Sequence, residues 1–373
     1  ADYKPYNEQE AHDQAVMRQL LATQPDLFTR ENQVAHMTAS SWLLNATHDK
    51  VLMIYHNIYH SWAWTGGHAD GDRDLLAVAK REAMEETGLR LTSFRFRAIV
   101  TFIADGWPPE YMCLYTADGF EGELTDCNEG KLEWVKKAEV TKLKLWEGDK
   151  IFLKLIAEEA PFFSLKLMYQ GDVLKEAVLD GKPLELFDIC DTDGNPTGET
   201  TERSVAHTLG TVHRTVHTWV VRQSADDGFE VLLQKRSLRK DSFPGCYDTS
   251  SAGHIQAGDE PLPSAVRELS EELGIEAQEE DLTYIGRFDS GEILANFDGR
   301  PFHDREIGFV YVYQKPVELE KLLLQEDEVD AVEWMPYEKA LEAVKRHEDG
   351  YCIKDQDLEL VGAYLGRKTD TRK

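Results

Sequence analysis

Hydrophobic and polar residues follow one another along the chain with spacings that predict both helices and strands. Apolar residues at helical spacing predict an amphipathic helix over residues 7–24 and a second helix over residues 74–87, which ends at Gly88. Shorter apolar runs predict strands at residues 36–45, 51–55, 94–102 and 111–115, with closing strands in 162–179. Residues 65–72 are expected to form a Gly-rich loop, and residues 140–157 to contain a further helix.

The same order of elements occurs a second time in the C-terminal half. The difference in residue number between the two members of each pair increases slowly along the chain, while the order of the pairs is kept. Loop insertions in one copy of a duplicated fold have this effect. The length of 373 residues also favours two domains. We therefore expect domains at residues 1–182 and 183–373. The matching pairs are His36 and His213, Gly67-His68 and Gly253-His254, Arg81-Glu82 and Arg267-Glu268, and Glu133-Trp134 and Glu333-Trp334.

The residues that suggest chemistry lie on one predicted helix in each half. Three glutamates are spaced at i, i+3 and i+4, which places their carboxylates on one helical face. Like charges at this spacing repel one another, and oxygen ligands of this kind suit Mg²⁺ or Mn²⁺. The sequence therefore predicts a divalent-cation site on each helix. The glutamates are Glu82, Glu85 and Glu86 in the first half and Glu268, Glu271 and Glu272 in the second.

Each glutamate helix is preceded by a Gly-His loop and followed by a glycine and an aliphatic residue. This pattern resembles the Nudix box, and each half carries one copy of it. The resemblance implies an α+β protein made of two Nudix-type α/β/α sandwich domains in tandem. It also implies a hydrolase that uses Mg²⁺ or Mn²⁺ to cleave the diphosphate linkage of a nucleoside diphosphate derivative, through in-line attack of water on phosphorus.

The resemblance assigns roles to individual residues. The six helix glutamates match the catalytic and metal-binding positions, and one carboxylate of each trio, or a loop glutamate, would act as general base. Glu129 lies where MutT-like members have an additional metal-binding glutamate, and Glu328 is its counterpart in the second half. A solvated loop is the alternative interpretation of the acidic run at residues 325–330 around Glu328. The structural positions of the motif are Gly67, Arg81, Gly88, Gly253, Asp259, Arg267 and Gly274.

Both copies depart from the motif at the position of its first glutamate. In the family this glutamate holds the arginine of the motif, which is Arg81 or Arg267 here. Asp259 occupies this position in the second copy and can reach Arg267. Arg73 occupies it in the first copy and would face Arg81 with like charge. An alternative hypothesis is therefore that the first domain binds a nucleotide without cleaving it. The residues that could take over from Arg73 are Asp72 and Asp74.

The second half also resembles a subgroup allied to isopentenyl diphosphate isomerase, through several segments between residues 187 and 245. A set of histidines and carboxylates falls near the metal ligands of that isomerase. Strand-end histidines with local hydrogen bonds are an equally favoured interpretation, for His217 as well. The isomerase needs a cysteine where this chain has Ala252, and Cys246 lies too early to replace it, so isomerase activity is disfavoured. The matching positions are His207, His213, His254, Asp304 and Glu306.

Substrate contacts are expected from loops outside the motif. Basic residues before the second motif could clamp a diphosphate. The first half has no basic residue there and offers aromatic side chains that could stack on a base, although packing is the commoner role of paired tryptophans. The candidates are Trp62, Trp64, Lys235, Arg236 and Lys240.

Composition narrows the expected partners. A net charge of -28 repels a phosphate backbone, so binding to a nucleic acid polymer is disfavoured. Five scattered cysteines without a CxxC pair favour reduced thiols in a cytoplasmic protein. The chain has no long apolar run, and residues 1–10 lack the centre of a signal peptide, so no membrane partner is expected. The expected partner is a small-molecule diphosphate substrate, with a homodimer as an open possibility.

Overall fold

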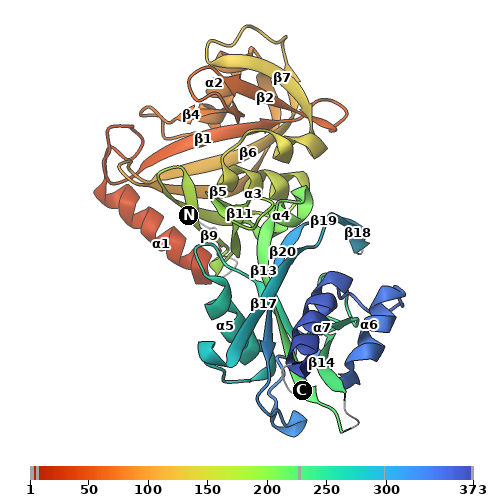
Figure 1. Ribbon diagram of the computed structural model, residues 1–373. Helices are drawn as coiled ribbons and strands as arrows, with labels where there is room; N and C mark the ends of the chain where they lie inside the picture. Colours follow the sequence, from red (N-terminus) through yellow and green to blue (C-terminus); the bar gives the residue numbers. More distant parts are fainter. Residues whose placement is uncertain (1–3, 6–7, 226–227, 298, 371–373) are drawn as a thin grey trace. The chain divides into compact units, whose positions relative to one another are not determined.

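The computed structural model describes residues 4–5, 8–225, 228–297 and 299–370, with side chains up to residue 366. These residues form two compact units (Figure 1). The first unit contains residues 1–186 and 200–205, and the second contains residues 187–199 and 206–373. Residues 200–205 thus belong to the first unit. The domains expected at residues 1–182 and 183–373 stay a prediction.

A mixed seven-stranded sheet forms the centre of the first unit, with the strand order β10-β9-β8-β5-β6-β1-β4. A smaller antiparallel sheet has the order β3-β2-β7. The strands are β1 (His36–Leu43), β2 (Lys50–His56), β3 (Trp62–Ala63), β4 (Thr65–His68), β5 (Arg90–Ala104), β6 (Glu110–Glu121), β7 (Gly130–Lys136), β8 (Phe163–Gln170), β9 (Val173–Leu179) and β10 (Lys182–Pro183). The helices are α1 (Glu8–Thr23), α2 (Leu75–Thr87), η1 (Lys137–Lys142) and α3 (Glu147–Ala157).

The second unit repeats the central part of this arrangement, with β13 pairing in parallel with β20 as β1 does with β6. Its main sheet has the order β15-β14-β13-β20-β17, to which β16 and β21 add. The strands are β11 (Leu186–Cys190), β12 (Pro196–Glu202), β13 (His213–Gln223), β14 (Phe229–Arg236), β15 (Tyr247–Asp248), β16 (Ser251–His254), β17 (Leu282–Asp289), β18 (Ile293–Phe297), β19 (Arg300–Asp304), β20 (Glu306–Tyr313) and β21 (Val329–Pro336). The helices are α4 (Arg203–Leu209), α5 (Pro261–Leu273), η2 (Glu279–Asp281), η3 (Leu319–Lys321), α6 (Tyr337–Lys345) and α7 (Asp355–Asp370). Of these elements, β11, β12 and α4 have residues in both units, because residues 186 and 200–205 belong to the first.

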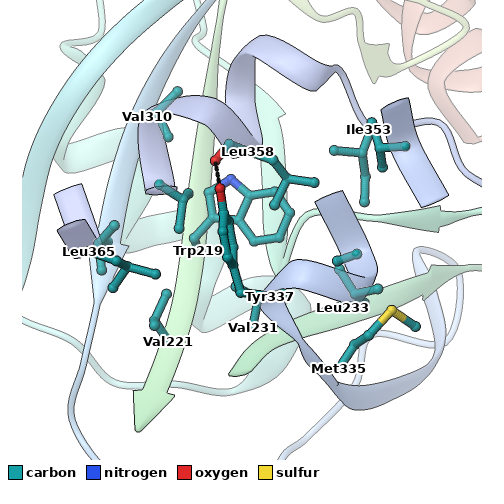
Figure 2. Packing of buried hydrophobic residues seen from close by; sticks show 14 of the residues in the cluster. Trp219, Val221, Val231, Leu233, Val310, Met335, Tyr337, Ile353, Leu358 and Leu365 are labelled. Carbon is teal, nitrogen blue, oxygen red and sulfur yellow. Dashed lines mark hydrogen bonds between the residues drawn. The ribbon is translucent and has the colours of Figure 1, made fainter. Parts of the chain in front are cut away.

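Side chains of β13 point alternately into two cores, one on each face of the sheet. Val216 and Val220 pack against α5 residues such as Leu269. Trp219 and its neighbours pack against α6 and α7 on the opposite face, where Tyr337 also donates a hydrogen bond to the Leu358 carbonyl (Figure 2). The second unit is therefore an α/β/α sandwich, as the resemblance implied.

The two glutamate helices begin and end as their sequences dictate. Asp74 caps α2 by accepting hydrogen bonds from two backbone amides, and Gly88 ends the helix with a φ of 77°. Helix α5 begins at Pro261 and ends at Leu273, and it is capped by Gly274, whose φ is 67°. A residue with a side chain would be strained at both glycines.

Two sequence predictions differ from the structure in detail. The predicted helix over residues 7–24 is observed as α1, with residue 7 outside the described residues, but it buries little apolar surface. Leu21 is 51% exposed, and the helix lines a cavity of about 450 Å³ together with Phe96 and Phe162. The predicted loop over residues 65–72 begins instead as the strand β4. Gly66 permits this, because a Cβ atom there would lie 2.4 Å from Ser40 Cβ on β1.

Candidate metal and catalytic centre

The first glutamate of helix α2 is held between an arginine and a glycine. Arg81 donates hydrogen bonds from Nη2 to Glu82 Oε1 at 2.7 Å and to the His68 carbonyl at 2.9 Å. A Cβ atom placed on Gly67 would lie 2.5 Å from Glu82 Oε2. The motif glycine is therefore required for the close approach of the β4 backbone to the carboxylate.

Helix α5 repeats this arrangement in the second unit. Arg267 Nη2 lies 3.0 Å from Glu268 Oε1 and also contacts the His254 carbonyl at 3.4 Å. A Cβ atom on Gly253 would lie 2.2 Å from Glu268 Cδ. The resemblance in sequence therefore extends to the same contacts around the first glutamate of each helix.

The last glutamate of each trio is buried, with exposed fractions of 7% for Glu86 and 5% for Glu272. Burial, together with nearby carboxylates, raises the pKa of Glu86 to about 9, although the backbone amide of Gly66 opposes this. Burial and Glu268 raise the pKa of Glu272 to about 8, although Glu272 accepts a hydrogen bond from the Ala252 amide at 3.0 Å. Carboxylates whose pKa values are raised in this way occur often at functional sites.

The loop glutamate of the first unit lies near the same helix face. Glu129 is among the charges that raise the pKa of Glu86, and its Oε2 lies 3.7 Å from His56 Nε2. Its counterpart Glu328 forms an ion pair with Lys240. The Glu129 carboxylate is therefore available beside the glutamate trio. The Glu328 carboxylate is instead paired with Lys240.

The two units differ at the position of the motif's first glutamate, which is Arg73 in the first unit and Asp259 in the second. Asp259 Oδ2 lies 3.0 Å from Arg267 Nη1, so the second unit contains the expected bracing contact. Arg73 lies over the ring of Phe28, with 5.6 Å from its guanidinium carbon to the ring centroid. Asp74 caps helix α2 and does not replace the missing brace. Arg81 is held by its contact with Glu82.

The second unit also gathers the histidines that the sequence suggested as metal ligands. His207, His213, His254 and Glu306 each offer a ligand atom within 4.8 Å of the others. His213 Nδ1 lies 2.8 Å from the Thr211 carbonyl, which leaves Nε2 facing the carboxylates. Burial, with a contribution from Asp304, raises the pKa of Glu306 to about 8. This set of imidazole and carboxylate donors suits a divalent transition metal.

Two residues of this region are not among the site residues that the sequence predicts, although Phe187 begins one of the segments that resemble the isomerase subgroup. Phe187 is fully buried and stacks on His213 and His254, with centroid separations of 4.7 and 4.5 Å. Asp357 on α7 accepts a hydrogen bond from the Trp219 indole at 2.7 Å and lies 2.7 Å from His217 Nδ1. His217 therefore belongs to a buried ion pair and is not among the clustered ligand atoms.

The proposed substrate residues make local contacts. Trp62 packs edge-on against Tyr55 and Trp64 against the fully buried Phe152. Arg236 Nη1 forms an ion pair with Asp248 at 2.8 Å. Lys240 is paired with Glu328, and Lys235 is exposed on β14. Their roles in substrate binding stay predictions.

Relatives with known names match parts of the chain. It is 40% identical over 177 residues to Nudix hydrolase 3 of Arabidopsis thaliana, covering 47% of this chain and 22% of that protein. It is 39% identical over 145 residues to an uncharacterized Nudix hydrolase of Clostridium acetobutylicum, covering 39% of this chain and 66% of that protein. The chain thus spans less than two thirds of either relative. An isopentenyl-diphosphate Delta-isomerase of Corynebacterium diphtheriae is 29% identical over 164 residues, covering 43% of this chain and 84% of that enzyme.

The chain is also similar to solved structures, and two of its segments match the NUDIX domain. A MutT protein from Bacillus halodurans is 28% identical and covers 39% of this chain and 99% of its own, with a TM-score of 0.37. Across the described residues, every helix is too short or too polar to cross a membrane. The model of the NUDIX domain matches residues 35–156 and again residues 212–356, which together make up more than half of the chain. The chain therefore belongs to the Nudix family and contains two Nudix domains.

Proposed function

We propose that the chain is a metal-dependent Nudix hydrolase that cleaves the diphosphate linkage of a nucleoside diphosphate derivative. Each domain would use its glutamate helix to bind Mg²⁺ or Mn²⁺ next to the substrate. The observation that carries the proposal is the equivalent placement of Glu86 and Glu272, two buried carboxylates whose pKa values are raised to about 9 and about 8.

The side chains present fit a divalent cation. Glu86 Oε2 is buried and has no hydrogen-bond partner among the described residues. Leaving a charged oxygen in such a position is unfavourable, and a nearby positive charge removes the penalty. Hard carboxylate oxygens on one helix face match the ligand preference of Mg²⁺ and Mn²⁺. Bound ions of this kind neutralise phosphate charge and acidify an attacking water.

The protein's own residues would orient this site. Arg81 and Arg267 fix the first glutamate of each trio, and the Ala252 amide fixes Glu272. We assign proton transfer to one carboxylate of each trio, or to Glu129 in the first domain, because a carboxylate beside the substrate can act as general base. The basic residues near the second motif are candidates for holding the diphosphate.

The histidine cluster of the second domain supports an additional divalent-ion site in that domain. Its proposed ligands are His207, His213, His254 and Glu306, with Asp304 Oδ1 at 3.7 Å from two of the histidines. Phe187 is fully buried and stacks on two of the rings. A hydrophobic wall of this kind strengthens the electrostatic interactions of the ligands.

Isopentenyl diphosphate isomerase activity is the second candidate, because several relatives carry that name at 29% or 30% identity. Ala252 argues against it, since its methyl group cannot transfer a proton to an alkene. Cys246 does not offer a reactive thiolate, because burial raises the pKa of its thiol. Conversion of isopentenyl diphosphate to its isomer by the purified chain would favour this candidate over hydrolysis.

The test uses a panel of nucleoside diphosphate derivatives with Mg²⁺ or Mn²⁺, assayed for cleaved product. Glu86→Gln and Glu272→Gln should each remove the activity of one domain, by about 100-fold or more. The matched controls are Glu123→Gln and Glu199→Gln, which change exposed glutamates of the two domains. Unchanged activity in both active-site variants would refute the proposal.

The same assay separates two working domains from one. Complete loss of activity with Glu272→Gln alone would leave the first domain as a nucleotide-binding module, as Arg73 suggested. Partial loss with each variant would assign catalysis to both domains. The pairing of Arg81 with Glu82 favours the second outcome, because it orients the first glutamate without the missing brace.

A further inference from the structure

Three residues of the first domain form a compact group beside the Nudix motif. His36 on β1, His68 on β4 and Glu110 on β6 each offer a ligand atom within 4.8 Å of the other two. None of them belongs to the glutamate trio of helix α2. The group therefore requires an explanation separate from the Nudix motif.

The strand registers show that this group is the counterpart of the histidine cluster in the second domain. His36 lies opposite Glu110 in the β1–β6 pair, as His213 lies opposite Glu306 in the β13–β20 pair. His68 lies opposite Thr38, as His254 lies opposite Thr215. Duplication has therefore kept two histidines and one glutamate at equivalent positions.

The distances agree as closely as the registers. The ring centroids of His36 and His68 are 5.1 Å apart, and those of His213 and His254 are 5.3 Å apart. His36 Nε2 lies 3.9 Å from a carboxylate oxygen of Glu110. His213 Nε2 lies at the same distance from a carboxylate oxygen of Glu306. These two distances are therefore similar in the two sets of donors.

We propose that His36, His68 and Glu110 bind a divalent transition-metal ion such as Zn²⁺, with three protein ligands and at least one exchangeable position. Two imidazoles and one carboxylate favour Zn²⁺ over Mg²⁺, which prefers oxygen ligands. Three ligands with a fourth position open is the arrangement of zinc sites that bind water or substrate. This site does not depend on the hydrolase activity proposed above.

The surroundings of His36 fit the role of a ligand. Its side chain is buried, with an exposed fraction of 7%. Its Nε2 faces Glu110 Oε2 at 3.9 Å. A buried imidazole that faces a carboxylate in this way is placed to share an ion with it.

A neighbouring hydroxyl orients the carboxylate. Thr38 Oγ1 donates a hydrogen bond to Glu110 Oε1 at 2.7 Å, so the other oxygen, Oε2, faces His36. Thr215 takes the corresponding position in the second domain, 3.5 Å from Glu306 Oε2. Partners of this kind fix the direction of a metal ligand and raise its affinity.

The two clusters differ in the number of donors. The second domain adds His207, with Asp304 close by, whereas the group found among the described residues of the first domain has three members. Fewer ligands give weaker binding and leave more of the ion open to exchange. We therefore expect the first-domain site to release its ion more readily than the site in the second domain.

The experiment measures bound zinc in the full chain by elemental analysis, after equilibration with buffered Zn²⁺ and gel filtration. His68→Ala and Glu110→Gln should each lower bound zinc by about one equivalent per chain. His12→Ala, which changes an exposed histidine of α1, is the matched control and should leave the stoichiometry unchanged. In chains loaded with Co²⁺, the same two variants should lose part of the visible absorption of a four-coordinate ion.

Two outcomes would overturn the proposal. One is a wild-type zinc stoichiometry in both His68→Ala and Glu110→Gln. The other is loss of the same equivalent in Glu86→Gln, which would assign the ion to the glutamate helix. Because Glu110→Gln keeps the size of the side chain and can still accept from Thr38, it answers the question even where His68→Ala does not fold.

Discussion

Arg267 Nη1 lies 3.0 Å from Asp259 Oδ2, whereas Arg73, which occupies the position of Asp259 in the first domain, lies over Phe28. The second domain therefore holds its motif arginine from two sides, through Asp259 and Glu268. We expect Asp259→Asn to lower kcat/KM of the second domain by about 10-fold, because the arginine then orients Glu268 less firmly. The measurement is made in a Glu86→Gln chain, so that only the second domain turns over.

The matched change in the first domain should have no such effect. Arg73→Ala in a Glu272→Gln chain removes a side chain that contacts Phe28 and should leave kcat/KM unchanged. Equal losses from both substitutions would contradict the assignment of the brace to Asp259 alone.

Gly67 and Gly253 are expected to matter for activity more than for stability. A Cβ atom would lie 2.5 Å from Glu82 Oε2 in one domain and 2.2 Å from Glu268 Cδ in the other. The flexible glutamate can move away, so we expect Gly253→Ala to cost only about 1 kcal/mol in unfolding free energy. Displacing the carboxylate should nevertheless lower second-domain activity by about 10- to 100-fold. Gly228→Ala, where nothing lies within 4 Å of the added atom, is the control.

Removal of metal should make stability depend on Glu272. Its pKa in the folded chain, about 8, lies above the ordinary value of 4.5, so the folded state holds a proton that the unfolded state releases. Unfolding free energy of the chelator-treated chain should therefore fall as pH rises from about 4.5 to 8. Glu272→Gln should stabilise the metal-free chain at pH 8 by roughly 2 kcal/mol. Urea unfolding at pH 5 and pH 8 tests this, and an equal effect at both values would contradict it.

The sequence predicted those parts of the site that depend on local spacing. The i, i+3, i+4 pattern placed Glu82, Glu85 and Glu86 on one helical face, and the duplicated motif indicated the Nudix fold, which the family match confirms. Asp74 shows the limit of this reasoning. Its position one residue after Arg73 makes it a candidate brace for Arg81, but as the residue before α2 it accepts hydrogen bonds from the free amides of the first turn.

Contacts between distant residues could not be predicted in this way. His217 and Asp357 are 140 residues apart, and nothing in either local pattern indicates their pairing. The proposed ligands His36, His68 and Glu110 of the first domain could be predicted only in part. The repeat already aligned His36 with His213 and His68 with His254, but Glu110 is matched to Glu306 only by the register of parallel strands.

The ion pair between His217 and Asp357 should make the second domain more stable below neutral pH than above it. Burial alone would lower the pKa of His217, but the adjacent Asp357 carboxylate outweighs this and raises the pKa to about 9. A histidine whose folded pKa exceeds its unfolded value of 6.5 stabilises fully below pH 6.5 and loses that contribution as pH rises through 9. Asp357→Asn should therefore cost roughly 3 kcal/mol at pH 6, since it leaves a buried imidazole without its counter-charge. Urea unfolding of the wild type and the variant between pH 6 and 9.5 measures the difference, which should shrink as pH rises. A difference that stays constant over this range would show that Asp357 acts through its hydrogen bond to Trp219 and not through the charge of His217.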